Sequence, residues 1–220
     1  MSPTPKAGYF TKDGIKVPGT TTVIGRFKES GALLRWAYKR GKDGLELYES
    51  RDKAAELGTI VHEMVEEYIR GGNPYNVVPT AITLEDQAQI VSAFEAFEEW
   101  FESNKFQIVE QEVQLVSEIH KYGGTPDAIA IDAKGRLVLL DWKTSDGVYS
   151  DHLVQLGAYR MLWNETHPDN QLTGGSHLCR FAKTNGDFAH HFFPDLTDAE
   201  RQFVLFREAY DLDKRLKKRA

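Results

Sequence analysis

The sequence has only one cysteine, Cys179, among its 220 residues. A single thiol cannot form an intramolecular disulfide, supply a cysteine-based zinc finger or hold an iron–sulfur cluster that needs four cysteines. Long apolar runs are also missing, because no stretch of 18 apolar residues occurs, and this argues against a transmembrane helix. The first residues lack the apolar region of a secretory signal. We therefore expect a cytoplasmic protein that has no membrane partner.

The chain also lacks an excess of positive charge, since its formal net charge is −6. The charge is unevenly distributed. Residues 1–53 hold 11 basic and 6 acidic residues, residues 54–119 hold 2 and 13, and residues 120–220 hold 14 of each. A wholly basic nucleic-acid surface is thereby excluded, but a polyanion could still bind the basic first quarter together with the basic run 214–219.

Helical periodicity is the main feature of the chain up to about residue 105. A short hairpin is expected at 9–17, and a short helix is expected to begin near Thr20. Apolar residues at helical spacing then predict three longer helices, at 33–41, 57–69 and 83–103.

From about residue 106 the hydrophobic pattern takes the period of strands. Strands are expected at 108–116, 128–132, 137–141, 176–181 and 188–193, with helices at 150–163 and from Thr197. The first three strands form a meander, and the apolar run before Asp141 indicates a central strand. Residues 1–220 are expected to form a single α/β domain, with a mainly helical lobe over 1–105 and an α/β core over 106–220.

Two carboxylates and a lysine occur at a spacing that is typical of an active site. Asp127 follows Thr125-Pro126, and Asp141 comes 14 residues later, two positions before Lys143. On adjacent antiparallel strands this separation can bring the two carboxylates together, and side-chain alternation places Asp141 and Lys143 on one face. Carboxylate oxygens suit Mg²⁺ or Mn²⁺, and a nearby lysine can hold a phosphate oxygen or assist an attacking water. The set suits phosphodiester hydrolysis.

The alternative is that Asp127 only caps a turn and that Asp141 and Lys143 form a surface ion pair. The position of Asp141 argues against this alternative, because it ends an otherwise apolar strand. A carboxylate there is costly unless it has a partner or a metal.

Further polar residues accompany this set. Gln155 and Tyr159 are four residues apart and share one face of the predicted helix. His62 lies near the edge of the apolar face of its own helix, with Glu66 one turn later. A boundary histidine with a hydrogen-bond partner is the more common interpretation of His62. A zinc-protease motif is excluded because position 66 is Glu where that motif has His.

Four short motifs in this order resemble the PD-(D/E)XK nuclease superfamily, and specifically its RecB-type exonuclease branch. They are Gly58-Thr59-x-x-His62, Thr125-Pro126-Asp127, Asp141-Trp142-Lys143-Thr144-Ser145 and Gln155-Leu156-x-x-Tyr159. Residues 17–24 and 33–37 are also similar to phage exonucleases and to mitochondrial genome maintenance exonuclease. The resemblance implies a restriction-endonuclease-like core, in which helices flank a mixed central sheet, with an N-terminal helical lobe and no iron–sulfur cluster.

The resemblance also implies roles for individual residues. The metal ligands would be His62, Asp127, Asp141 and the backbone carbonyl of Trp142, with Glu66 as an additional candidate. Lys143 would be the catalytic lysine, while Gln155 and Tyr159 would position the strand and the attacking water. DNA contacts are expected from Arg35, Trp36, Lys39, Arg40, Thr144 and Ser145, where Trp36 could stack on a base.

The function implied is a Mg²⁺- or Mn²⁺-dependent DNA exonuclease that acts on single-stranded DNA or strand ends. Its setting would be phage or mobile-element recombination, replication or repair, with a recombination or replication protein as a possible partner. Two alternatives stay open: a flap endonuclease that uses the same site, and an inactive DNA-binding module.

Overall fold

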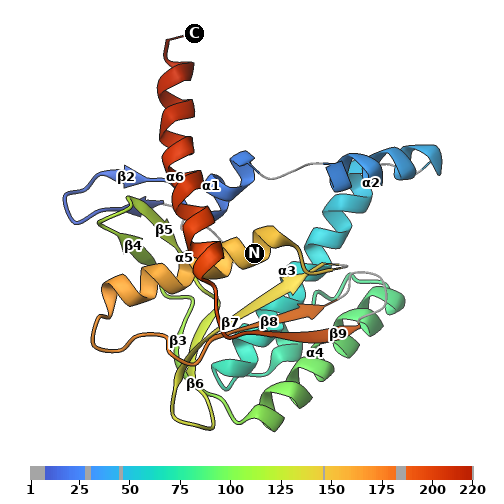
Figure 1. The fold of residues 1–220 in the computed structure, drawn as a ribbon. Helices are drawn as coiled ribbons and strands as arrows, with labels where there is room; N and C mark the ends of the chain where they lie inside the picture. Colours follow the sequence, from blue (N-terminus) through green and yellow to red (C-terminus); the bar gives the residue numbers. More distant parts are fainter. Residues whose placement is uncertain (1–7, 28–30, 45–46, 146, 182–186, 220) are drawn as a thin grey trace.

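A five-stranded mixed sheet forms the centre of the computed structural model, which describes residues 8–27, 31–44, 47–145, 147–181 and 187–219 (Figure 1). In spatial order its strands are β3 (Gln107–Gln111), β6 (Ala128–Ile131), β7 (Leu137–Thr144), β8 (Ser176–Phe181) and β9 (Phe188–Phe193). The middle strand, β7, pairs antiparallel with β6 and parallel with β8. The predicted meander and the central position of its last strand are confirmed.

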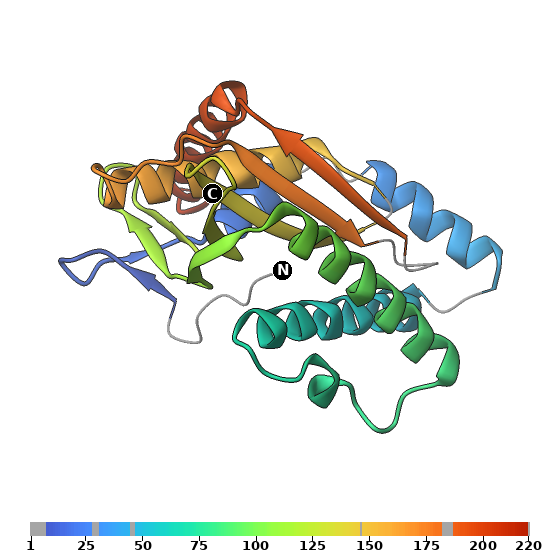
Figure 2. The same ribbon diagram turned by 90° about the horizontal axis from the view of Figure 1, so that it is seen from below.

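Helices cover both faces of this sheet (Figure 2). They are α1 (Thr20–Phe27), α2 (Gly31–Lys42), α3 (Leu47–Ile69), the 3-10 turn η1 (Pro74–Val77), α4 (Leu84–Asn104), α5 (Ser150–Thr166) and α6 (Thr197–Lys217). Helices α3 and α4 lie on one face, whereas α5, packed against α1 and α6, lies on the other. The predicted α/β fold, a mixed central sheet flanked by helices, is confirmed.

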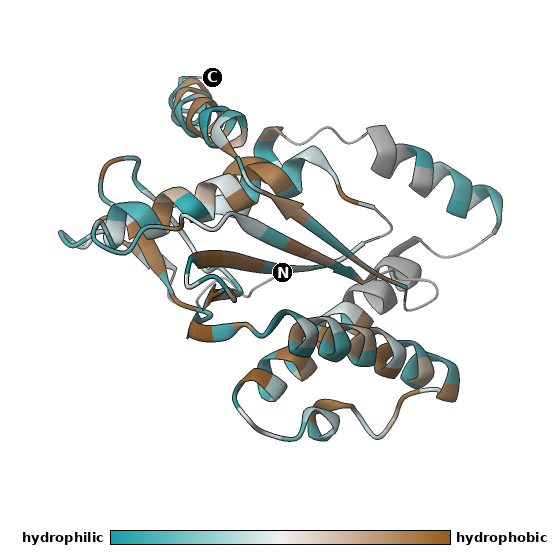
Figure 3. Cartoon of the chain, turned by 60° about the horizontal axis from the view of Figure 1, so that its bottom comes forward, coloured by the Kyte–Doolittle hydropathy of each residue, from teal (hydrophilic) through white to brown (hydrophobic). Residues whose placement is uncertain are grey.

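The alternation of side chains along the strands creates two separate cores. Ala130 and Leu140 point toward α3 and α4, where they join Met64, Phe94 and Phe97. The neighbouring positions face the other way, and the residues of that second core include Ile129, Leu139, Leu156, Leu162 and Phe203. Figure 3 shows the hydrophobic residues concentrated along these strands. A sheet buried on both faces explains why its strands are almost continuously apolar.

The predicted ends of the helices correspond to identifiable caps. The hydroxyl of Thr83 accepts a hydrogen bond of 3.1 Å from the backbone N–H of Asp86, which satisfies one of the free donors at the start of α4. Helix α3 ends before Gly71, whose φ of +80° is accessible to glycine without strain. Helix α3 begins at Leu47, however, about ten residues earlier than the apolar pattern indicated.

One predicted strand, 108–116, is corrected by the structure. It divides into β3 and β4 (Leu115–Ser117), because a bulge at Ile108/Glu110 and the left-handed Glu112, with φ of 53°, break the pairing with β6. Strand β4 pairs instead with β5 (Tyr122–Gly124), which sequence reasoning missed. The predicted N-terminal hairpin is confirmed as β1 (Tyr9–Phe10) and β2 (Lys16–Val17). Most of the connection between the strands predicted at 176–181 and 188–193 lies outside the described residues.

Two histidines pair across β8 and β9. His177 Nδ1 and His190 Nε2 are 2.8 Å apart, and the two rings stack at 5.0 Å. Burial and the neighbouring His190 lower the pKa of His177 from 6.5 to about 4. The folded chain therefore binds a proton at His177 less readily than the unfolded chain does. As a result, the free energy of unfolding falls as the pH drops from about 6.5 toward 4.

We expect the free energy of unfolding to decrease by about 1 kcal/mol more in the native chain than in His177→Gln when the pH is lowered from 7.5 to 5, after allowance for the partial exposure of the ring. Urea unfolding at the two pH values measures this difference. Equal pH dependence in both proteins would show that the pair does not contribute.

No helix within the described residues combines the length and the apolarity needed to span a membrane.

Candidate active site

The two carboxylates lie at one end of the β6–β7 pair. Ala128 and Leu140 are the last paired residues at this end, and Asp127 and Asp141 are the next residues of the two segments. The backbone N–H of Trp142 donates a 2.7 Å hydrogen bond to Oδ2 of Asp127, and both aspartates are buried. The 14-residue spacing therefore brings Asp127 and Asp141 close together, as predicted from the sequence, because a tight turn joins the two paired strands that they flank.

Lys143 lies on the same face of β7 as Asp141, and its Nζ forms an ion pair with Oδ2 of that carboxylate. The same Nζ is 3.4 Å from the carbonyl oxygen of Trp142. Oδ1 of Asp141 has no hydrogen-bond donor among the described residues, although the side chain is fully buried. Burial raises the pKa of Asp141 to about 6, against the lowering effect of Lys143. A buried carboxylate needs a cation or hydrogen-bond donors, and Lys143 supplies a cation to one of its two oxygens.

His62 approaches the same point from α3. Its side chain is buried, and its Nε2 has no partner of regular hydrogen-bond geometry in the described part of the chain. Burial lowers the pKa of His62, while Asp127 and the carbonyl of Trp142 act in the opposite direction. A neutral imidazole with a free nitrogen is the form that binds metals.

Gly58, one turn before His62, allows α3 to approach β7 closely. A Cβ at this position would lie 2.8 Å from Oγ1 of Thr144 and 2.9 Å from its Cβ. This close approach gives a physical reason for glycine in the Gly58-Thr59-x-x-His62 motif.

We expect Gly58→Ala to lower the thermal unfolding midpoint, although the same change in a free helix interior stabilises by roughly 0.5–1 kcal/mol. Gly25→Ala in α1 is the matched control, because nothing lies within 4 Å of the added Cβ there. Thermal unfolding followed by circular dichroism measures both variants. If Gly58→Ala is stabilised like the control, the close contact with Thr144 does not constrain α3.

Helix α5 adds two polar side chains on the face toward the sheet. Nε2 of Gln155 donates a 2.7 Å hydrogen bond to the hydroxyl oxygen of Tyr159, and both residues are buried. Burial, and then the charges of Asp141 and Asp127, raise the pKa of Tyr159 well above its usual value. The phenol therefore stays protonated and can donate a hydrogen bond near the carboxylates.

Tyr9 of the N-terminal hairpin belongs to this region, and sequence reasoning missed it. Its hydroxyl is 2.9 Å from Oγ1 of Thr125, two residues before Asp127. Its ring lies so close to Gly123 that a Cβ there would overlap it at 2.2 Å. The consecutive glycines just before the Thr-Pro-Asp motif were the available signal, because they mark a close approach of other atoms to the backbone.

The remaining predicted residues lie farther out. Glu66 is engaged with Arg70 at 3.1 Å, while its carbonyl accepts from Gln111. Thr144 contacts Gly58, and Ser145 donates a hydrogen bond to the carbonyl of Gly147. On α2, Arg35 and Lys39 are exposed and Arg40 is half-buried, whereas the side chain of Trp36 lies outside the described residues.

The donor set fits a divalent cation in its chemistry. Two carboxylates, a neutral imidazole and a backbone carbonyl lie in one region, and Oδ1 of Asp141 and Nε2 of His62 are buried without hydrogen-bond partners of regular geometry among the described residues. Within the described residues, however, no three His, Cys, Asp or Glu side chains are already arranged closely enough to hold an ion. Lys143 instead neutralises Asp141.

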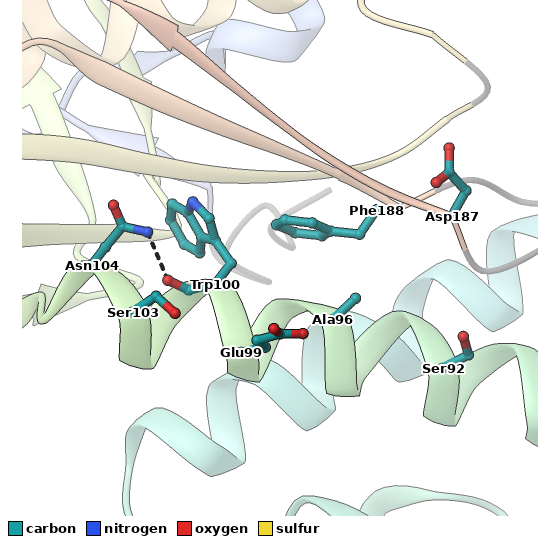
Figure 4. A pocket seen from close by; sticks show the side chains of 8 residues that line it. All are labelled: Ser92, Ala96, Glu99, Trp100, Ser103, Asn104, Asp187 and Phe188. Atoms are coloured by element: carbon teal, nitrogen blue, oxygen red, sulfur yellow. Dashed lines mark hydrogen bonds between the residues drawn. The ribbon is translucent and has the colours of Figure 1, made fainter.

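A surface hollow of about 710 Å³ lies apart from this site, between α4 and the start of β9 (Figure 4). Its lining residues are Ser92, Ala96, Glu99, Trp100, Ser103, Asn104, Asp187 and Phe188. None of the predicted site residues contributes to it.

Comparison with known proteins gives one extensive match. Residues 32–218 match the model of the PD-(D/E)XK nuclease superfamily. No curated protein matches the sequence significantly. Among solved structures, a candidate exonuclease from Eubacterium rectale is 14% identical, with a TM-score of 0.41 over 70% of this chain and 68% of that one. An alkaline exonuclease from Laribacter hongkongensis is 12% identical, with a TM-score of 0.35 over 76% and 93%.

The family match spans the four motifs on which the resemblance to the superfamily rested, from Gly58 to Tyr159, but it does not include residues 17–24. It also includes α2 except for its first residue, all of α3 to α6, and the five strands of the central sheet. Because most of the chain is matched, the protein belongs to the PD-(D/E)XK nuclease superfamily.

Proposed function

We propose that the protein is a divalent-metal-dependent DNA exonuclease of the RecB type that acts on single-stranded ends. The observation that carries the proposal is the buried set of Asp127, Asp141 and Lys143 at one end of the β6–β7 pair. In a member of a nuclease superfamily, such a set is where phosphodiester hydrolysis is expected.

The residues that would hold the metal are His62, Asp127, Asp141 and the carbonyl of Trp142. When bound there, Mg²⁺ or Mn²⁺ would polarise the phosphate and lower the pKa of a coordinated water. Glu66 is a less direct candidate, because Arg70 already neutralises its carboxylate. The protein's own contribution is a buried site whose ligands are supplied by α3, β7 and the residue before β6.

Lys143 would hold a phosphate oxygen and neutralise the charge that develops there. Gln155 and Tyr159 would orient the strand, because the protonated phenol and the amide are already joined in a fixed geometry. Arg35, Trp36, Lys39 and Arg40 on α2, with Thr144 and Ser145 at the end of β7, would guide the strand toward the carboxylates. A role in phage or mobile-element recombination, replication or repair follows from the resemblance of residues 17–24 and 33–37 to phage exonucleases.

The test uses single strands labelled at the 5′ or the 3′ end, their duplex, a flap substrate and a circular single strand, each with Mg²⁺, Mn²⁺ or EDTA. Degradation of linear single strands alone, abolished by EDTA, is the expected result, and the labels give the polarity. Cutting of the flap or the circle would replace the exonuclease with an endonuclease. Metal-independent DNA binding without any cutting would indicate an inactive binding module.

A further inference from the structure

Helix α6 carries an apolar stripe on its outward side. Leu205, Leu212 and Leu216 are 56%, 52% and 63% exposed, so that one helix presents three large apolar side chains to solvent. With Ala209 they follow one another at intervals of four, three and four residues, the spacing of a coiled-coil seam. The C-terminal part of α6 extends away from the rest of the molecule (Figure 1).

The stripe is not the face by which α6 packs on its own chain. Phe203 and Arg207 are the buried residues of α6, and helical geometry places them on the side opposite the leucines. Phe206, which stacks on Phe27 of α1 at 5.5 Å, borders the same buried side. The leucines therefore lie outside the surface that α6 buries against its own chain, and α1 contacts the flank formed by Phe206 and Asp213.

We propose that this stripe binds the α6 helix of a second copy of the chain, in antiparallel orientation about a two-fold axis. In two antiparallel helices the numbers of facing residues have a constant sum. An alignment that places Leu205 opposite the partner's Leu216 therefore also places Ala209 opposite the partner's Leu212. Small and large residues then alternate across the contact. One surface that complements itself is what a two-fold interface requires.

The charges beside the stripe favour this orientation. Glu208 and Arg215 both border it on the same side, at the positions just before Ala209 and Leu216. In the antiparallel pair each Glu208 lies beside the partner's Arg215, so two opposite-charge contacts form. In a parallel pair Glu208 would instead lie beside the partner's Asp213, which carries the same sign of charge and is already paired with Arg26 of its own chain, so no opposite-charge contact would form. The charge pattern therefore selects the antiparallel partner.

The contact is small, so the dimer should be weak. Four side chains over about three helical turns cover much less than the roughly 1,200–2,000 Å² that stable interfaces bury. We expect a reversible monomer–dimer equilibrium at about micromolar concentrations or above, strengthened at low salt by the flanking charges.

Sedimentation velocity of the full chain over a wide concentration range tests the proposal. We expect Glu208→Arg and Arg215→Glu each to weaken association at least about tenfold, and the double variant to restore it, because the exchanged charges again face each other. Leu212→Glu should leave the protein monomeric with an unchanged circular dichroism spectrum, since this leucine is half-exposed. Lys214→Glu is the matched control, because it makes the same charge change on the opposite side of α6.

A native chain that stays monomeric at the highest concentration would overturn the proposal. If Lys214→Glu weakens association as much as Arg215→Glu does, the antiparallel contact is overturned. It is also overturned if the double variant does not restore association. Neither outcome depends on nuclease activity, so the test is independent of the proposed function.

Discussion

Replacing Asp141 by asparagine should reduce DNA hydrolysis at least about 10³-fold, the order of loss seen when a group that stabilises transition-state charge is removed. Asparagine keeps the size of the side chain but removes its negative charge. In the described structure Oδ1 of this carboxylate accepts no hydrogen bond. Hydrolysis of an end-labelled single strand under single-turnover conditions measures the loss.

Stability must be measured with activity, because Asp141→Asn leaves Lys143 buried without its partner. Breaking a buried pair in this way can cost about 3–5 kcal/mol. Asp132→Asn is the matched control, since Asp132 binds Arg136 in the β6–β7 turn, away from the site, at 2.7 Å. We expect the control to lose some stability and to keep its activity.

A readout other than activity separates loss of metal from loss of fold. Added Mn²⁺ should raise the unfolding midpoint of the native chain and of Asp132→Asn, because a ligand that binds only the folded state stabilises it. The midpoint of Asp141→Asn should not respond. If Asp141→Asn keeps more than about a tenth of the native rate, the carboxylate is not part of the catalytic set.

Replacing Phe97 by alanine should lower the free energy of unfolding by about 3–5 kcal/mol. The ring is fully buried between the sheet and α3, stacks on Phe101 at 5.5 Å and meets Trp142 edge-on at 5.0 Å. Its removal leaves a cavity under the residue whose backbone N–H holds Asp127. Urea unfolding measures the change.

Phe97→Ala should mainly lower the stability of the protein, whereas Asp141→Asn should mainly lower its activity. At a low temperature where it is still folded, Phe97→Ala should keep most of its activity, and the activity should disappear at a lower temperature than in the native chain. Phe97→Leu, which retains much of the volume, should cost less than half as much. A loss below about 1 kcal/mol in Phe97→Ala would mean that the aromatic core closes around the missing ring.

Local pattern was sufficient for most of the fold and for the centre of the site. The change from a helical to a strand period in the hydrophobic pattern predicted where the helices and the strands lie. The short turn between two paired strands predicted that Asp127 and Asp141 lie close together. Lys143 followed from simple alternation along β7. These relations involve residues close in sequence, whose mutual geometry is dictated by the local backbone.

Only the tertiary structure decided how distant segments complete the site. The unpartnered nitrogen of His62 depends on how α3 packs across the end of β7, and the contact of Tyr9 with Thr125 joins residues more than a hundred positions apart. The break at Glu112 and the pairing of β4 with β5 were equally hidden, because strand propensity does not specify a partner. The sequence alone thus identified Asp127, Asp141 and Lys143 as the candidate set and β7 as the strand that presents two of them. The side chains that surround them depend on packing between elements, which no local pattern encodes.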